Sequence, residues 1–268
     1  MTQSDSAPRS RHDLGGLIDR ARSADGQPPF SDQALLELRT GERELLVLGS
    51  ATAILSPDEA EFVVEPDARG RGQGTAMLEA LIARSPRGLL LWAHGDHPAA
   101  RALAASHGLV AVRELLQLRA EVAPRAAEPF DGFHVGVDEE AWTEVNARAF
   151  AGHPEQGSVT VDDLLQLETE PWFEAEDFLL ARDGEAIAGY CWLKVDAGLG
   201  EVYVLGVDPS RQGTGLGRRL LEAGLSRLAG RGIRTALLYV EADNEPALAL
   251  YRSLGFAPHS TDVQYRLS

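Results

Sequence analysis

Two distant segments of the chain carry nearly the same glycine-rich pattern. Residues 64–74 read Val-Glu-Pro-Asp-Ala-Arg-Gly-Arg-Gly-Gln-Gly, and residues 207–217 read Val-Asp-Pro-Ser-Arg-Gln-Gly-Thr-Gly-Leu-Gly. Each copy follows an apolar run typical of a β-strand and precedes an apolar-periodic segment typical of a helix. A strand, a glycine loop and a helix in this order present backbone N–H groups and the positive end of the helix dipole to an anion. The pattern therefore predicts two copies of one phosphate-binding domain.

Hydrophobic periodicity predicts the same order of elements in both halves, as expected for a repeated α/β domain. In the first half, the expected helices are 14–22, 32–39, 75–84 and 97–106, and the expected strands are 44–48, 51–55, 61–64 and 89–93. In the second half, the expected helices are 139–150, 161–169, 216–228 and 244–254, and the expected strands are 133–137, 177–182, 187–195, 201–207, 235–241 and 264–267.

The repeat and the prolines between its copies predict the domain limits. A chain of 268 residues can form two domains of about 130 residues each. Pro124 and Pro129 stand among alanine and glutamate residues that are typical of a linker. The expected domains are therefore 1–122 and 132–268, joined by a linker at 123–131.

The acidic composition limits the expected partners. The chain has 41 acidic and 25 basic residues and a net charge of −16, whereas nucleic acids and anionic membranes attract basic surfaces. Its one cysteine, Cys191, excludes an intrachain disulfide. No apolar run approaches the roughly 20 residues of a membrane span, and residues 1–13 lack the apolar core of a signal peptide. A cytoplasmic protein with neither a nucleic acid nor a membrane partner is expected.

The two glycine loops differ from common nucleotide-binding motifs. Residues 69–74 read Arg-x-x-Gly-x-Gly and residues 212–217 read Gln-x-x-Gly-x-Gly, without the lysine and hydroxyl residue of a P-loop. This signature resembles the acetyl-CoA pyrophosphate loop of the GCN5-related N-acetyltransferases. The resemblance implies two tandem domains, each with a mixed, splayed central sheet flanked by helices. Gly206 suits the bulge that such splaying needs.

A second resemblance is more specific. Residues 149–157 read Ala-Phe-Ala-Gly-His-Pro-Glu-Gln-Gly, and together with residues 92–95, 192–195, 200–209 and 237–244 they are similar to the mycothiol synthases (mycothiol acetyltransferases). The resemblance runs over nearly the whole chain beyond the first 25 residues. It implies acetyl-CoA-dependent acetylation of the cysteinyl amine of a cysteinyl-glucosaminyl-inositol precursor, the last step of mycothiol biosynthesis. Because a tandem chain already contains the domain pairing that many single-domain relatives obtain by dimerising, a monomer is expected.

Two side chains in the second copy are candidates for the proton transfers of this reaction. Glu201 stands at the start of the strand expected to splay and is the candidate general base, with a solvated strand-end glutamate as the alternative. Tyr251, on the helix after Asn244, matches the family's general acid, with a packed aromatic side chain as the alternative. The first copy has Ala104 opposite Tyr251, so we expect catalysis in the second copy.

The family resemblance also assigns binding residues. In the first copy, the implied acetyl-CoA-binding residues are Phe62, Val63, Val64, Arg69, Gly70, Gly72 and Gly74. In the second copy, they are Leu205, Gly206, Val207, Gln212, Gly213, Thr214, Gly215, Leu216, Gly217, Arg218 and Asn244. The implied binding residues for the small-molecule thiol and amine substrate are Asp32, Glu155, Lys194, Glu201 and Tyr239. Asp32 replaces a family glutamate and also suits a helix N-cap, and Lys194 has a solvated strand-edge lysine as its alternative.

Other chemistries receive less support from the sequence. Direct transfer needs no covalent intermediate, so Cys191 is not expected to be a nucleophile. His94 and His97 have no third ligand apparent in the sequence, so no metal is predicted. Two alternatives stay open: an N-acetyltransferase for another small amine, such as an aminoglycoside or polyamine, and a non-catalytic acyl-CoA-binding module.

Overall fold

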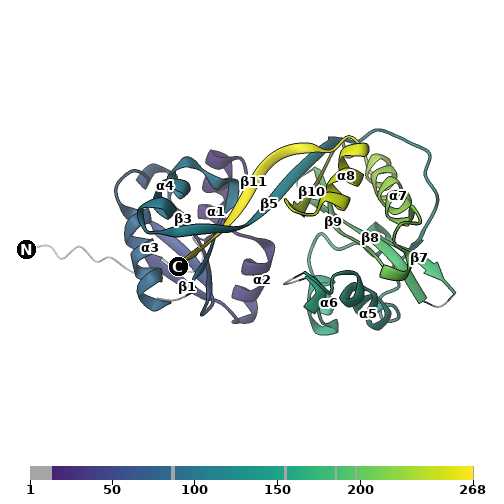
Figure 1. The fold of residues 1–268 in the computed structure, drawn as a ribbon, viewed down its shortest axis with the longest axis horizontal. Coiled ribbons are helices and arrows are strands. Elements are labelled where there is room, and N and C mark those ends of the chain that lie inside the picture. The colour runs from purple at the N-terminus through teal and green to yellow at the C-terminus, as the bar shows by residue number, and fades with distance from the viewer. Residues whose placement is uncertain (1–13, 86–87, 154–155, 185, 197, 268) are drawn as a thin grey trace, which may run out of the picture. The chain divides into compact units, whose positions relative to one another are not determined.

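The computed structural model describes residues 14–85, 88–153, 156–184, 186–196 and 198–267, which form two compact units (Figure 1). The first unit extends to Leu115 and includes the C-terminal segment from Ser260, and the second unit is Leu116–His259.

The first unit has a mixed sheet with helices on both faces. Its strand order is β1(Glu44–Leu48), β2(Ala51–Leu55), β3(Glu59–Val64), β4(Leu90–Ala93) and β11(Ala257–Leu267), and only the pairing of β3 with β4 is parallel among the described pairs. Its helices are α1(Leu14–Asp25), α2(Asp32–Thr40), α3(Gln73–Arg84) and α4(Pro98–Ser106), and it contains the 3₁₀ turns η2(Pro66–Ala68) and η3(His94–Asp96). One apolar cluster joins the sheet to α3 and α4, and another joins it to α1 and α2.

The second unit repeats this arrangement. Its strand order is β5(Leu109–Glu121), β10(Thr235–Glu241), β9(Leu199–Val207), β8(Ala186–Asp196), β7(Phe178–Asp183) and β6(Asp131–Gly132). Its helices are α5(Glu139–Ala149), α6(Val161–Leu167), α7(Leu216–Gly230) and α8(Glu245–Ser253), and its 3₁₀ turns are η4(Gln156–Ser158), η5(Ala175–Asp177) and η6(Pro209–Arg211). Leucines of α7 and α8 pack on one face of the sheet, and an aromatic cluster around Trp192 packs on the other.

The expected strand at 133–137 is wrong. Only Asp131 and Gly132 pair with β7 in this part of the described chain. Beyond them, the Asp138 carboxylate accepts a hydrogen bond from the His134 N–H at 2.8 Å, and this local bond turns the chain into α5.

The last strand of each copy joins the other copy's sheet. β5 closes the first copy in sequence, yet its end pairs in the second unit, where the Val122 N–H donates to the Arg234 carbonyl at 2.9 Å. β11 closes the second copy, yet its residues from Val263 to Arg266 pair antiparallel with β4. The units therefore differ from the expected domain limits of 1–122 and 132–268, because backbone pairing exchanges these two strands.

His94 links the exchanged strand β11 to β3 within the first unit. Its Nδ1 lies 2.9 Å from the Asp262 carboxylate, and its Nε2 lies 3.1 Å from the Glu61 carboxylate of β3. Burial lowers the pKa of His94, but the two carboxylates outweigh burial and raise it to about 10. His94 is therefore an imidazolium at neutral pH, and its charge links strands from opposite ends of the chain.

The predicted splay of the sheet is confirmed in the second unit. β9 and β10 run parallel and pair at Gly200 with Ala236 and at Glu201 with Leu237; beyond these residues the described strands no longer pair. β3 and β4 separate in the same way after Glu61 and Trp92. Each unit thus has an opening between two parallel strands next to its glycine loop.

The bulge lies at Tyr203, and the expectation that Gly206 forms it is wrong. Trp192 of β8 pairs with Val204 and Leu193 pairs with Val202, so Tyr203 is the extra residue. Gly206 pairs regularly with Tyr190. A Cβ at Gly206 would lie 2.5 Å from Cζ of Tyr190, so glycine is required there by close packing.

Candidate active site

Glu201 occupies the point where β9 and β10 separate. It is the last residue of β9 that pairs with β10 over the described chain, and its side chain is half-buried. On its other side it pairs with Lys194 of β8. Cross-strand partners project from the same face of a sheet, so the candidate base and a candidate substrate-binding cation share one face beside the opening.

Aromatic side chains surround the Lys194 ammonium. Its Nζ lies 5.1 Å from the ring centroid of Trp172 and 5.8 Å from that of Tyr203. These distances allow cation–π attraction to both rings. The side chain is 9% exposed, which contradicts the alternative of a solvated strand-edge lysine. Trp172 and Tyr203 could not be identified from the sequence, because their proximity to Lys194 depends on the bulge and on a distant loop.

Tyr251 lies on α8 with its side chain 8% exposed. Burial, and to a smaller extent the neighbouring Cys191, raises the pKa of Tyr251 above its usual range. The phenol is therefore protonated at neutral pH and retains a proton to donate. Its ring also packs edge to face on Phe256 at 5.9 Å, so packing and proton donation are compatible roles. Asn244 caps this helix by accepting a hydrogen bond from the Ala247 N–H at 3.2 Å.

Cys191 lacks the environment of a nucleophile. Its side chain is fully buried, and burial raises the pKa of the thiol to about 12. A reactive cysteine needs accessibility and a stabilised thiolate. The structure therefore agrees with the expectation that Cys191 does not attack the substrate.

The glycine loop of the second unit has a backbone shape that suits an anion. Gly213 and Gly215 have φ values of 74° and 80°, a region that side chains disfavour. Gln212 Nε2 donates to the Val207 carbonyl at 3.2 Å, and Thr214 Oγ1 donates to the Arg211 carbonyl at 2.6 Å. These two bonds stabilise the loop internally. The loop leads into the 15-residue helix α7, whose first-turn amides have no acceptors within the helix.

The remaining implied acetyl-CoA residues of the second unit adjoin this loop. Leu205, Gly206 and Val207 follow the bulge on β9, which no longer pairs with β10 there. Gly217 lies in the first turn of α7 beside β9, where a Cβ would make an ordinary contact with Val207 at 3.5 Å. Arg218 donates to the Ser253 hydroxyl at 2.5 Å and so links α7 to α8.

The glycine loop of the first unit has the same backbone shape, but its arginine is held in an ion pair. Gly70 and Gly72 have φ values of 72° and 77°, and Arg69 Nε donates to the Val64 carbonyl at 3.1 Å, as Gln212 does to Val207. The Arg69 guanidinium is also bonded to both carboxylate oxygens of Asp25, at 2.6 and 2.7 Å. In this structure, that ion pair engages the cation expected to bind phosphate.

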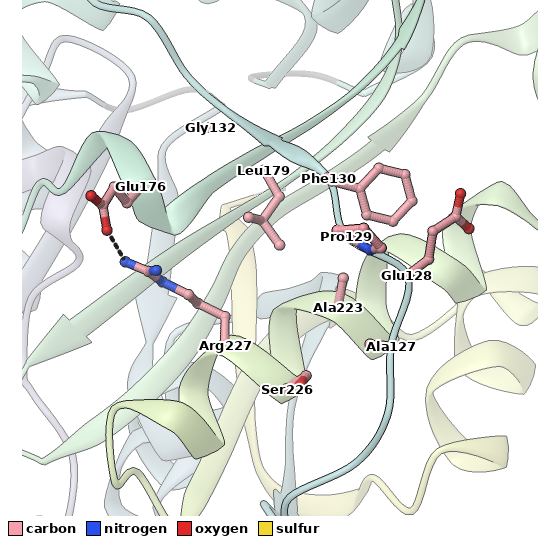
Figure 2. Close-up of a pocket in the computed structure, with 10 residues that line it drawn as sticks. All are labelled: Ala127, Glu128, Pro129, Phe130, Gly132, Glu176, Leu179, Ala223, Ser226 and Arg227. Atoms are coloured by element: carbon pink, nitrogen blue, oxygen red, sulfur yellow. Dashed lines mark hydrogen bonds and ion pairs between the residues drawn. The ribbon is translucent and has the colours of Figure 1, made fainter.

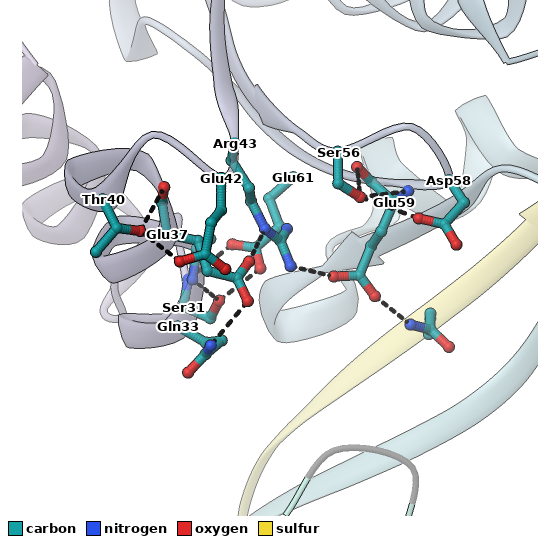
Figure 3. Close-up of polar contacts among 12 residues, drawn as sticks. Ser31, Gln33, Glu37, Thr40, Glu42, Arg43, Ser56, Asp58, Glu59 and Glu61 are labelled. Atoms are coloured by element: carbon teal, nitrogen blue, oxygen red, sulfur yellow. Dashed lines mark hydrogen bonds and ion pairs between the residues drawn. The ribbon is translucent and has the colours of Figure 1, made fainter. Parts of the chain in front are cut away.

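A glutamate equivalent to Glu201 occurs in the first unit but is held in an ion pair. Glu59 pairs with Leu90 in the first sheet as Glu201 pairs with Leu237 in the second, although β3 and β4 stay paired for two more residues, to Glu61 and Trp92. Its carboxylate accepts a hydrogen bond from Arg43 at 2.7 Å (Figure 3). It accepts another from Gln264 at 2.9 Å. An adjacent cation stabilises the charged form of a carboxylate and weakens it as a base. The first copy thus has an ion-paired carboxylate at this position, and it has Ala104 in place of the tyrosine.

The other predicted substrate residues lie apart in the chain. Tyr239 lies on β10 beyond the separation point and is half-buried. Asp32 is exposed in the first turn of α2; Ser31 caps that helix by accepting from the Ala34 N–H, so the alternative of Asp32 as N-cap is wrong. Glu155 lies outside the described residues. Phe62, Val63 and Val64 lie on β3, and Gly74 lies in α3.

The second unit also contains a pocket of about 340 Å³ away from this constellation (Figure 2). It is lined by the linker residues from Ala127 to Phe130, by Leu179 and by residues of α7. None of its lining residues belongs to the predicted site, and its charged groups are paired: Arg227 with Glu176 at 2.9 Å, and Glu128 with Arg219 at 3.0 Å.

The described ranges contain no group of three or more His, Cys, Asp or Glu side chains placed to hold a metal ion. Nor do they include a helix long and apolar enough to cross a membrane.

Comparison with known proteins places the chain among acetyltransferases. The Acetyltransferase (GNAT) family matches residues 140–256. A mycothiol acetyltransferase from Clavibacter michiganensis is 48% identical over 272 residues, covering 93% of this chain and 89% of the relative. Another, from Streptomyces avermitilis, is 48% identical over 275 residues, with coverages of 93% and 89%.

Solved structures share the fold. A GCN5-related N-acetyltransferase from Sphaerobacter thermophilus superposes with a TM-score of 0.69 at 24% identity, covering 97% of this chain and 94% of that one. A tandem GNAT protein from the clavulanic acid biosynthesis pathway superposes with a TM-score of 0.68 at 18% identity, covering 97% and 95%. At these sequence identities, the structural similarity shows the tandem fold and nothing about function.

Proposed function

The chain belongs to the mycothiol acetyltransferase family of tandem GCN5-related N-acetyltransferases, and on that premise we propose that it acetylates the cysteinyl amine of the cysteinyl-glucosaminyl-inositol precursor. It is an N-acetyltransferase that uses acetyl-CoA. The proposed reaction is the last step of mycothiol biosynthesis. The observation that carries the proposal is the position of Glu201, at the separation of β9 and β10 and opposite Lys194.

The residues of the second unit fit acetyl-CoA. Glycines at positive φ shape the loop before α7, and the first-turn amides of this helix suit a pyrophosphate. The released edge of β9 at Leu205, Gly206 and Val207 suits a pantetheine arm, which bears amide groups. When bound, acetyl-CoA supplies the acetyl group as an activated thioester.

Two side chains carry the proton transfers in this proposal. Glu201 takes a proton from the substrate ammonium, directly or through water, and leaves an amine that can attack the acetyl carbonyl. Tyr251 donates its phenolic proton to the sulfur as the carbon–sulfur bond breaks. The nitrogen then gives up its second proton, which restores the Tyr251 phenol, and the neutral amide is formed. The coenzyme leaves as a thiol, and Glu201 releases its proton to water, so that one proton is produced in each turnover. Lys194 and Tyr239 bind polar groups of the substrate and hold its amine for attack.

The first unit has a binding role in this proposal. Its loop repeats the backbone shape of the second, so Phe62, Val63, Val64 and residues 69–74 could hold a second acetyl-CoA without turnover. Calorimetric titration with acetyl-CoA counts the sites. A stoichiometry of two supports a second site, and a stoichiometry of one removes it.

The test of the function is thiol release from acetyl-CoA by the purified full chain. The cysteinyl-glucosaminyl-inositol precursor is compared with aminoglycosides and polyamines at equal concentrations. We expect saturable turnover with the cysteinyl amine alone. Turnover with another amine only would retain the acetyl transfer and discard this substrate. Binding of acetyl-CoA with no turnover across the panel would favour the acyl-CoA-binding module.

A further inference from the structure

Gln117 is a buried polar residue that the exchanged strand β5 brings into the second unit. Its side chain is 2% exposed, and its Nε2 lies 2.7 Å from the hydroxyl oxygen of Tyr239. Gln117 and Arg119 project from one face of β5, whereas Leu118 packs into the apolar core on the other face. A buried amide requires hydrogen-bond partners, and those of Gln117 are the side chains of Tyr239 and Arg119.

The partner on the other side fixes the orientation of the Gln117 amide. Arg119 Nε donates to Gln117 Oε1 at 2.9 Å. A guanidinium can only donate, so the oxygen of the amide must face Arg119 and its NH₂ group must face Tyr239. The Tyr239 oxygen therefore accepts from Gln117, and the Tyr239 O–H proton is directed to a different group.

The same arrangement recurs in the first unit. Gln264 stands as far beyond Gly255 in the sequence as Gln117 stands beyond Gly108. It lies on the other exchanged strand, β11, and its Nε2 donates to the carboxylate of Glu59 at 2.9 Å. Each exchanged strand thus brings a buried glutamine donor next to the separating strands of the unit that it joins. Both units therefore place a buried glutamine at the same position of the repeat, on the strand received from the other copy.

We propose that Gln117 is a positioning residue that holds the Tyr239 hydroxyl as a hydrogen-bond donor toward an acceptor on the amine substrate. The inference rests on the proposed function, because it takes Tyr239 as a substrate-binding residue. The acceptor is a carbonyl or hydroxyl oxygen of the cysteinyl or sugar portion. In this arrangement, the last strand of the first copy completes the substrate site of the second.

The substitution Gln117→Glu tests the direction of this hydrogen bond. A carboxylate keeps the size of the side chain and still accepts from Arg119, but it has no N–H to offer. The Tyr239 hydroxyl must then donate to residue 117 and is lost as a donor to substrate. We expect the KM for the amine to rise roughly tenfold, the scale of one hydrogen bond. The KM for acetyl-CoA should stay within about twofold of its original value, by the same argument.

Tyr239→Phe and the double variant complete the test. If Gln117 acts through Tyr239, the double variant has the same amine KM as Tyr239→Phe alone. Gln33→Glu, the same exchange at an exposed position, is the control and should leave both KM values unchanged. If Gln117→Glu unfolds the chain, Arg119→Met is used instead, because it removes the donor that orients the amide. It should raise the amine KM by a smaller factor.

The outcomes separate this inference from the proposed function. An unchanged amine KM in a folded Gln117→Glu variant would overturn the inference, as would additive effects in the double variant. A rise in both KM values that follows a fall in melting temperature would also overturn it, because it would indicate a structural role. If the unsubstituted chain acetylates a different amine, the proposed substrate is wrong, and the same comparison with that amine decides the role of Gln117.

Discussion

Lys194 and Glu201 are direct cross-strand partners on β8 and β9, at the position where β9 separates from β10. The ammonium of one and the carboxylate of the other therefore belong to the same face of the sheet. Trp172 and Tyr203 hold the ammonium through their ring faces. The candidate base and the candidate substrate-binding cation are therefore neighbours on one face of the sheet.

Glu201→Gln should remove the base and keep the shape of the site. We expect kcat to fall by about 10²- to 10⁴-fold, the usual contribution of general base catalysis, whereas acetyl-CoA affinity should not change. Glu59→Gln is the matched control, because Glu59 has the equivalent register position but is paired with Arg43. It should lower the melting temperature and leave kcat unchanged. Similar kcat values for Glu201→Gln and the original chain would exclude Glu201 as the base.

Tyr251→Phe should separate proton donation from packing. Phenylalanine keeps the edge-to-face contact with Phe256, so we expect an unchanged melting temperature and unchanged acetyl-CoA affinity by calorimetry. Without a proton donor for the departing sulfur, kcat should fall at least about 10²-fold. If kcat is retained while stability drops, Tyr251 is a packing residue and another group protonates the thiolate.

Trp172→Leu should weaken the position of the Lys194 ammonium. Loss of a cation–π contact of about 1 kcal/mol predicts a rise of roughly fivefold in the KM for the amine substrate. Trp172→Phe retains an aromatic face and should recover most of the loss. Steady-state kinetics with each substrate varied in turn measures both effects. Equal losses in the leucine and phenylalanine variants would argue against an ammonium–ring interaction.

His94→Gln should destabilise the first unit in a pH-dependent way. Removal of the imidazolium leaves the buried Glu61 carboxylate without its cation and should reduce the free energy of unfolding by about 3 kcal/mol. The folded pKa of His94 is about 10, above the value of about 6.5 expected for an unfolded histidine. Its contribution is therefore complete below about pH 6.5 and is lost as the pH rises through about 10.

Urea unfolding of the original chain and of His94→Gln, from pH 6 to pH 10, measures this contribution. The difference in unfolding free energy should shrink steadily as the pH rises. A difference that stays constant over this range would mean that His94 is already neutral at pH 6 and stabilises the unit by packing alone.

Local patterns in the sequence predicted most of the architecture. The glycine loops could be recognised because the turn requires positive φ at fixed positions, such as Gly213 and Gly215. Most helices and strands followed from apolar periodicity, which depends on near neighbours. Tyr251 and Glu201 could be proposed because family resemblance marks positions in the sequence. Their roles stay predictions.

Contacts between distant segments could not be predicted in this way. The sequence aligns the two copies without a gap at their loops, so the bulge at Tyr203 conceals the correspondence of Glu59 with Glu201. The contacts of Trp172 with Lys194 and of Gln117 with Tyr239 bring together residues far apart in the chain. Periodicity carries no information about such pairs.

The sequence by itself determined the repeat, the two glycine loops and the order of helices and strands, because these depend on residues close together in the chain. Only the tertiary structure decided which sheet each closing strand joins. β5 pairs with β10 and β11 pairs with β4, and in each case the partner is far away in the sequence, so local patterns do not specify the pairing. Specific contacts accompany the final pairing, such as His94 with Asp262 and Gln117 with Tyr239, and they form only when the whole chain has folded.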